Sequence, residues 1–132
     1  MTEEGNAGRR ASPPRVTARQ GEDAVAELLV RRGYTILERN LRIGRGEIDI
    51  VAGRGDLVCL VEVKARRSLA RGQPYEAVTA GKRDQLRRLG RLYAARDPSK
   101  RYRFDVASVT WRRGGGPVVR YYENAFTLGD PP

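Results

Sequence analysis

Residues 46–64 read GEIDIVAGRGDLVCLVEVK, and charged residues here interrupt two apolar runs rich in β-branched side chains. The runs, residues 47–51 and 57–65, flank a Gly-Arg-Gly-Asp sequence whose composition is typical of a hairpin turn. Most of the second run is apolar on both faces, which is typical of a strand covered on both sides. The stretch therefore predicts a β-hairpin whose second strand lies in the centre of a sheet.

Three charged residues, Asp49, Glu62 and Lys64, lie inside these predicted strands. An ionised carboxylate in a dry interior is costly unless a partner or a metal compensates its charge. Because side chains alternate along a strand, Glu47 and Asp49 are predicted to share one face of the first strand. The same rule puts Glu62 and Lys64 on one face of the second strand. If the register brings these faces together, the charged groups converge.

Metal-dependent phosphodiester hydrolysis uses this set of residue types. Mg²⁺ takes one or two carboxylates and fills its other positions with water, carbonyl oxygen and substrate phosphate. Asp49 and Glu62 could supply the carboxylates, and Lys64 is placed to orient the attacking water and to stabilise charge on the phosphate. The alternative interpretation is an ion pair at the end of a strand, which is the commoner meaning of an isolated Glu-x-Lys sequence.

The spacing of Asp49 and the Glu62-Val63-Lys64 sequence resembles the PD-(D/E)xK nuclease signature, with Ile48 where that superfamily has proline. Most of the chain also resembles the YraN-like family, a bacterial group related to archaeal Holliday-junction resolvases. The matching sequences are Gly21-Glu22 with Ala26, Gly33-Tyr34, Asn40, residues 46–49, residues 61–64, Lys82, residues 103–106 and residues 123–126. The resemblance implies metal-binding acids at Asp49 and Glu62, a catalytic Lys64, and branched DNA as substrate. Resolvases are typically homodimers, so a homodimer is a further expectation.

Composition narrows the function classes. A chain of 132 residues is expected to form one domain. It has no His and a single Cys, which removes His-dependent catalysis, His-ligated zinc and an internal disulfide. Cys59 lies in an apolar run, so it is interpreted as a small buried hydrophobe. The sequence shows no membrane-spanning segment and no signal peptide, which predicts a cytoplasmic protein without a membrane partner.

The net charge of +10, from 26 basic and 16 acidic residues, favours a polyanionic partner. We therefore expect nucleic acid, with DNA favoured. The basic residues predicted to contact it are Arg45, Arg66, Arg67, Lys82 and Arg83.

The helices are predicted from apolar periodicity. The first is expected to begin at Thr17, which has capping-box spacing, and to end at Gly33. Glu22 lies on its apolar stripe. There it either bonds an arginine or a backbone group, or assists the metal site through a bound water or a second ion.

The second helix is expected from Thr79 to about Arg96, before Pro98, with Leu86, Leu89 and Tyr93 on its buried face. Lys82, one turn before Leu86, could reach the site. Four other basic residues of this helix, Arg83, Arg87, Arg88 and Arg91, are predicted to face outward.

Further strands are predicted over residues 34–43, 101–111 and 118–122. Asp105, inside the second of these, is expected to pair with a nearby arginine rather than to join the site. Residues 1–16 are predicted to form a disordered basic arm, residues 17–128 a single nuclease-like domain, and residues 129–132 a short tail.

The order of elements predicts an α/β fold with a restriction-endonuclease-like core, a mixed central sheet flanked by helices. The leading function is an endonuclease dependent on Mg²⁺ or Mn²⁺ that hydrolyses DNA. In it Asp49 and Glu62 hold the metal, Val63 offers its carbonyl, Lys64 orients water and Glu22 assists. One alternative is a non-catalytic nucleic-acid-binding protein that retains the fold, for DNA or for RNA, including a ribosome-associated role. Another is a protein-interaction module.

Overall fold

The structure is a computed structural model, and it describes residues 15–66 and 80–126. Its elements are α2 (Arg15–Arg31), β1 (Thr35–Ile43), β2 (Gly46–Arg54), β3 (Leu57–Ala65), α3 (Ala80–Ala94), β4 (Arg101–Trp111) and β5 (Pro117–Phe126). Within these ranges, neither helix combines the length and the apolar content that crossing a membrane requires.

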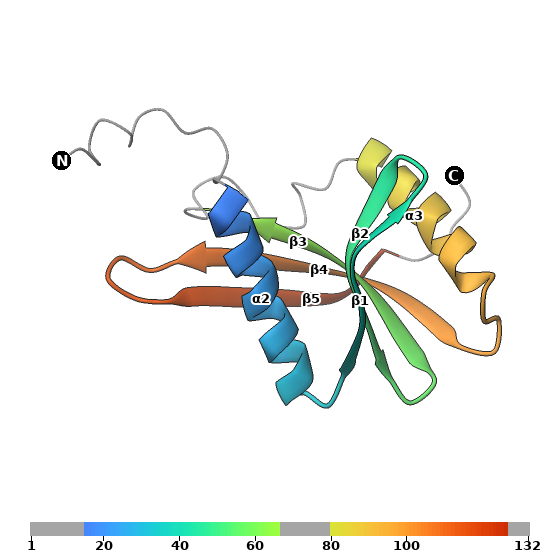
Figure 1. Ribbon diagram of the computed structural model, residues 1–132, viewed down its shortest axis with the longest axis horizontal. Helices are drawn as coiled ribbons and strands as arrows, with labels where there is room; N and C mark the ends of the chain where they lie inside the picture. The colour runs from blue at the N-terminus through green and yellow to red at the C-terminus, as the bar shows by residue number, and fades with distance from the viewer. Residues whose placement is uncertain (1–14, 67–79, 127–132) are drawn as a thin grey trace.

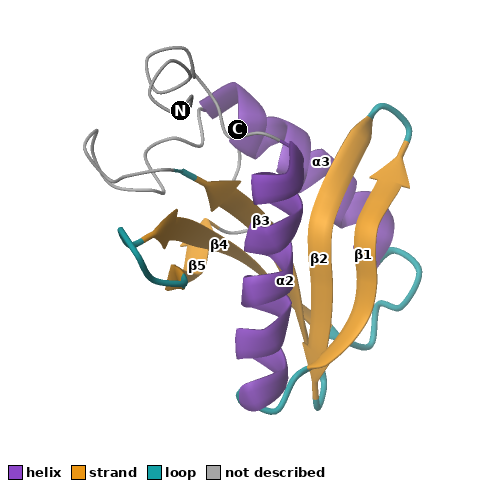
Figure 2. Ribbon diagram, turned by 60° about the vertical axis from the view of Figure 1, so that its left-hand side comes forward, coloured by secondary structure: helices purple, strands orange, loops and turns teal. Residues whose placement is uncertain are grey.

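The five strands form one sheet in the order β1-β2-β3-β4-β5. Neighbouring strands are antiparallel except β3 and β4, which run parallel because α3 lies in the connection between them. Figures 1 and 2 show α2 on one face of this sheet and α3 on the other. The predicted α/β fold, a mixed sheet flanked by helices, is confirmed, and the hairpin of residues 46–64 supplies its central strand β3.

The core consists of two apolar layers, one on each face of the sheet. The layer under α2 contains Val25, Leu29, Tyr34, Ile50, Ala52, Leu57, Cys59, Val61, Ala107 and Val109. The layer under α3 contains Ile48, Val51, Val58, Leu60, Leu86, Leu89, Phe104 and Val106. Because β3 contributes to both layers in alternation, it is buried over most of its length.

The sheet forks between β2 and β3. The paired residues of these strands run from Arg54 and Leu57 to Ile50 and Val61 and go no further, although both described strands continue. Beyond this point β2 stays paired with β1, and β3 stays paired with β4. In both views the β1–β2 turn and the end of β3 diverge from each other (Figures 1 and 2).

The fork also changes which way the side chains of β2 point. Ile48 packs under α3 and Ile50 packs under α2, although a regular strand would put both on the same face. Ile48 and Ile50 therefore depart from the strict alternation expected for residues 47–51, although the charge of Glu47 still contributes to the raised pKa of Asp49.

The helix ends differ in how well the sequence predicted them. α2 begins at Arg15, two residues before the predicted start at Thr17. Its end is as predicted, because Gly33 has a φ of 90° and the Tyr34 N–H donates to the Leu29 carbonyl at 2.9 Å. α3 ends at Ala94, two residues before the predicted end. Its predicted cap, Thr79, lies outside the described residues.

β4 has the predicted bounds, whereas β5 extends to Phe126 instead of ending at Tyr122. The pairing of β4 and β5 shifts register between Phe104 and Val106. Opposite this shift Asn124 adopts a φ of 54°, and its N–H donates to the Asp105 carboxylate at 2.8 Å. This bond helps β5 to continue through Glu123 and Asn124, residue types that are depleted in strands.

Candidate active site

Asp49 lies where the sheet forks, and its carboxylate takes the place of a backbone acceptor. Its Oδ2 accepts a hydrogen bond of 2.8 Å from the Val63 N–H. That N–H points toward β2, at a level where the described strands β2 and β3 no longer pair. The side chain of Asp49 is thereby fixed beside the end of β3.

Glu62 lies on β3 beside this point and is 7% exposed. Two ammonium groups lie near its Oε2, Lys64 Nζ at 4.0 Å and Lys82 Nζ at 3.9 Å. Lys64 lies on the same face of β3, and Lys82 comes from the first turn of α3. The structure thus brings together Asp49, Glu62 and Lys64, and Lys82 reaches the same carboxylate.

Burial and nearby negative charges raise the pKa values of both carboxyls. Burial, and next the charge of Glu62, raise the pKa of Asp49 to about 7, while the Val63 N–H opposes this shift. Burial also raises the pKa of Glu62, although Lys82 and then Lys64 act against it. Both acids are therefore less readily ionised than usual at this point of the fold, and a nearby cation would relieve them.

This donor set fits a hard divalent cation. Within the described residues, no group of three or more His, Cys, Asp or Glu side chains is arranged to hold a metal. Mg²⁺ does not need such a cage, because it binds through one or two carboxylates and keeps several water ligands. Asp49 and Glu62 supply two carboxylates, and the backbone of Val63 lies beside the first of them.

Glu22 approaches the site from α2, and its charge contributes to the raised pKa of Asp49. Its carboxylate accepts hydrogen bonds from Asn40 Nδ2 at 3.1 and 3.2 Å. Arg39 Nη2 lies 3.7 Å away. Glu22 thus lies beside an arginine, as the first interpretation expected, and bonds Asn40, while its assistance to a metal site stays a prediction. Sequence reasoning missed Asn40 as that partner, and its positive φ of 50° in β1 is visible only in the structure.

The predicted nucleic-acid contacts are spread around this end of the sheet. Arg45 is exposed in the β1–β2 turn, and Arg66 follows β3, with its N–H donating to the Val109 carbonyl at 2.8 Å. Arg83 is half-buried in the first turn of α3 beside Lys82. Arg67 lies outside the described residues.

Arg87 and Asp105 belong elsewhere. Arg87 was predicted to face outward, but its side chain is 15% exposed and pairs with Asp84 at 2.9 Å, so this prediction is wrong. Asp105 pairs with Arg103, as predicted, at 2.9 Å.

Cys59 lies near this pair, and burial followed by the Asp105 charge raises the pKa of its thiol to about 11. A protonated, buried thiol agrees with the absence of a reactive role.

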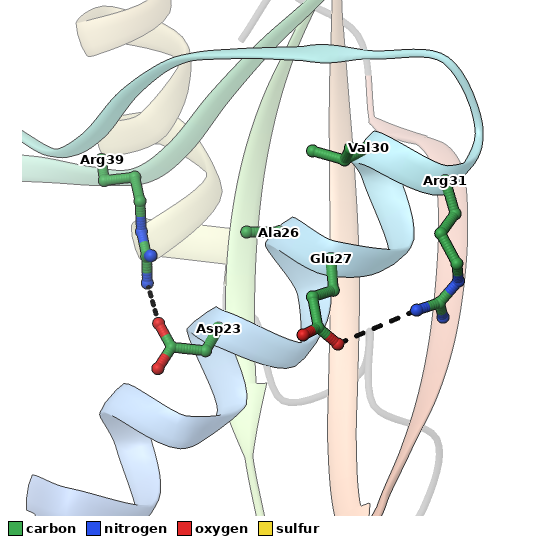
Figure 3. Close-up of a pocket in the computed structure, with 6 residues that line it drawn as sticks. All are labelled: Asp23, Ala26, Glu27, Val30, Arg31 and Arg39. Atoms are coloured by element: carbon green, nitrogen blue, oxygen red, sulfur yellow. Dashed lines mark hydrogen bonds and ion pairs between the residues drawn. The ribbon is translucent and has the colours of Figure 1, made fainter.

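A groove of about 670 Å³ lies beside α2, and each acidic side chain that lines it lies next to an arginine (Figure 3). Its lining residues are Asp23, Ala26, Glu27, Val30, Arg31 and Arg39. Arg39 pairs with Asp23 at 2.7 Å, and Arg31 lies 3.8 Å from Glu27. Since neither Asp49 nor Glu62 lines it, the groove is separate from the forked site.

Asp49→Asn is expected to stabilise the metal-free protein at alkaline pH. The folded-state pKa of about 7 lies above the ordinary value of 3.8, so the folded protein holds this proton more tightly than the unfolded chain does. The resulting stability is complete below pH 3.8 and is lost as the pH rises through 7. The amide oxygen of the variant can still accept the Val63 N–H. We expect a variant more stable by on the order of 3 kcal/mol at pH 8 in EDTA, and nearly equal proteins near pH 4.

Urea unfolding at several pH values would measure this difference. Added Mg²⁺ should stabilise the wild type at pH 8 much more than the variant, because the variant lacks one of the two carboxylates. A metal-free variant that is less stable than the wild type at pH 8 would support a structural ion pair instead.

Comparison with known proteins places this chain in a family. The family model described as "Uncharacterised protein family UPF0102" matches residues 21–109, which include all the acids and lysines of the forked site. UPF0102 proteins of Clavibacter michiganensis subsp. michiganensis and Symbiobacterium thermophilum are 45% and 46% identical to it over 109 and 108 residues. These alignments cover 81% and 80% of this chain and 92% of each relative.

A further relative, the UPF0102 protein CT2262 of Chlorobaculum tepidum, is 39% identical over 124 residues, 89% of this chain and 96% of that protein. Among solved structures, SfsA of Pyrococcus furiosus in complex with Ca²⁺ is similar, with a TM-score of 0.44 and 16% identity. That similarity covers 83% of this chain but only 63% of SfsA. On the family match and these identities, the chain belongs to the UPF0102 family, the YraN family that its sequence resembles.

Proposed function

We propose that this protein is an endonuclease that hydrolyses phosphodiester bonds in DNA with Mg²⁺ or Mn²⁺, acting on branched or otherwise structured DNA. The observation that carries the proposal is the pair of carboxylates at the fork, the half-buried Asp49 and the buried Glu62, whose pKa values are both raised, with Lys64 beside them. The preference for branched DNA rests on the resemblance to resolvases alone. Such a substrate implies a cytoplasmic location.

In this proposal Asp49 and Glu62 hold the metal, and the Val63 carbonyl is a further ligand. When bound, the metal lowers the pKa of a coordinated water and polarises the phosphoryl oxygen. Lys64 Nζ orients the attacking water and stabilises negative charge on the phosphate. Glu22, held by Asn40, accepts a hydrogen bond from water at the edge of the site.

Lys82 has a different part. Its ammonium group lies 3.9 Å from Glu62, on a helix rather than on the central strand. It therefore opposes the rise that burial causes in the pKa of Glu62, because a positive charge at this distance favours the ionised carboxylate. Lys82 is a positioning residue in this scheme, and Lys64 is the catalytic lysine.

The proposal is tested by cleavage of duplex, flapped, four-way and single-stranded DNA and RNA substrates, with Mg²⁺ or Mn²⁺ and with EDTA. Glu62→Gln should remove cleavage and retain binding. Glu27→Gln is the matched control, because it makes the same chemical change on an exposed part of α2. Loss of cleavage in the first variant alone supports the nuclease. Equal cleavage by wild type and both variants would indicate a contaminating enzyme.

A second candidate function is non-catalytic binding of DNA or RNA. One observation favours it: Glu62 already has two ammonium groups within 4.0 Å, which balance its charge without a metal. Tight binding of nucleic acid by the wild type, with no cleavage of any substrate in Mg²⁺ or Mn²⁺, would select this candidate.

A further inference from the structure

The β4–β5 hairpin reaches past the end of the sheet that carries the site. β4 runs parallel to β3 with Ser108 opposite Lys64, and it continues to Trp111 after β3 has ended at Ala65. At about 3.3 Å per residue, Arg112 lies roughly 13 Å beyond the level of Lys64. Figure 1 shows this hairpin projecting past α2 on the side toward which β3 points.

The base of the hairpin lies level with the site and on the same face of the sheet. Ser108 pairs with Lys64 on one side and with Arg120 on the other, so Arg120 is two strands, or about 10 Å, from Lys64. The residues that alternate with them, including Val63, Val109 and Val119, pack under α2. Lys64, Ser108 and Arg120 therefore form a row on the face that also carries Glu62.

The hairpin is positively charged and its charge is not compensated. Residues 106–122 contain three arginines, Arg112, Arg113 and Arg120, and no acidic residue. All three are exposed, and none forms an ion pair within the part of the chain that the structure describes. At the opposite end of the sheet, by contrast, Arg101 pairs with Asp56 at 3.0 Å. A group of unpaired cations on one arm attracts a polyanion.

The hairpin is also held in place at its base. Trp111 is half-buried and packs on the apolar layer under α2. Gly21 of α2 lies so close that a Cβ there would be 3.6 Å from Trp111 Cη2 and 3.2 Å from Ala65 Cβ. The arm is thereby fixed to both α2 and the end of β3. An arm that is already positioned loses little conformational entropy when it binds.

From this placement we infer that the β4–β5 hairpin is a DNA-binding arm, in which Arg112, Arg113 and Arg120 contact backbone phosphates next to the bond at the forked site. On the other side of the fork, Arg45 in the β1–β2 turn lies on the opposing branch of the sheet. The inference rests on the proposed function for the identity of its ligand. Beyond that function, the inference names residues outside the catalytic site that would hold the DNA.

The test compares two triple variants that each remove three positive charges. One is Arg112→Gln/Arg113→Gln/Arg120→Gln. The control is Arg31→Gln/Arg96→Gln/Arg101→Gln, whose residues lie outside the hairpin, at the end of α2, after α3 and at the start of β4. Affinity for a labelled DNA duplex is measured by fluorescence anisotropy over a range of NaCl concentrations in EDTA. Without metal the readout is binding alone, so it does not depend on whether the protein cleaves DNA.

We expect the hairpin variant to bind DNA about ten-fold or more weakly at moderate salt, and the slope of log K against log[salt] to fall by about 3. The control should bind within about two-fold of the wild type. Equal losses in the two variants, or none in the hairpin variant, would overturn the inference. So would weaker binding to phosphatidylglycerol vesicles with unchanged binding to DNA. If the expected losses occur but wild-type protein cleaves nothing, the arm stands and the nuclease proposal fails.

Discussion

Replacing Lys64 by methionine is expected to slow DNA cleavage about 10²–10³-fold, because the substitution removes the positive charge that acts on the water and the phosphate. Mg²⁺ affinity and DNA affinity should change little. The Lys64 side chain is 35% exposed, and Glu62 keeps Lys82 as a second cation at 3.9 Å. The fold should therefore survive the loss of Lys64, and rate and binding should separate.

Single-turnover cleavage, Mg²⁺ titration and thermal melting together distinguish the two roles of Lys64. Lys82→Met is the matched control, since it removes the other ammonium group near the same carboxylate. We expect it to weaken Mg²⁺ binding more than it slows cleavage at saturating metal. If Lys64 only compensates Glu62, its replacement should instead destabilise the protein by about 3–5 kcal/mol. A folded, metal-binding Lys64→Met protein that cleaves at the wild-type rate would refute the catalytic role.

The second large effect is expected away from the site, at the buried Arg103–Asp105 pair. Asp105 is fully buried and accepts bonds from Arg103 Nε and Nη2, both at 2.9 Å, from the Tyr121 hydroxyl and from the Asn124 N–H. Arg103→Met removes two of these donors and leaves a buried carboxylate without its cation. We expect a loss of about 3–5 kcal/mol in the free energy of unfolding.

Arg101→Met provides the control, because it makes the same substitution two residues away on β4. Arg101 and Asp56 are 67% and 61% exposed, so solvent screens their pair and breaking it should cost far less stability than the loss of Arg103. Urea unfolding at pH 7 would measure both losses. Adding Asp105→Asn to the Arg103→Met protein should recover part of the stability, since it removes the uncompensated charge. Similar losses for the two single variants would contradict this account.

Much of the fold could be predicted from local sequence. β-branched runs located β3 and β4, and the bounds of β4 were correct. The fork could not be predicted, because alternation along a strand assumes that pairing with the neighbour continues. Whether it continues depends on tertiary contacts: α3 packs so closely on the start of β2 that a Cβ at Gly46 would collide with the Leu89 side chain. No property of residues 46–51 alone indicates that contact.

The site was predictable in part for the same reason. Asp49, Glu62 and Lys64 are close in sequence and lie on paired strands, so their spacing predicted their proximity. The contact of Glu22 with Asn40 joins a helix to a strand, and no local pattern indicates it. Sequence reasoning also missed the three hairpin arginines. The composition gives the number of arginines but not which of them are paired with acids, and that pairing is what distinguishes Arg120 from Arg101.

The hydrogen bond from the Val63 N–H to Asp49 makes this amide a natural spectroscopic probe of the site. An amide that donates to a backbone carbonyl senses a side chain's ionisation only indirectly. Here the acceptor is itself the titrating group, with a pKa of about 7, so the ¹H and ¹⁵N shifts of Val63 should follow its protonation. One resonance would then report proton and metal binding in solution, with no label attached and no substrate present.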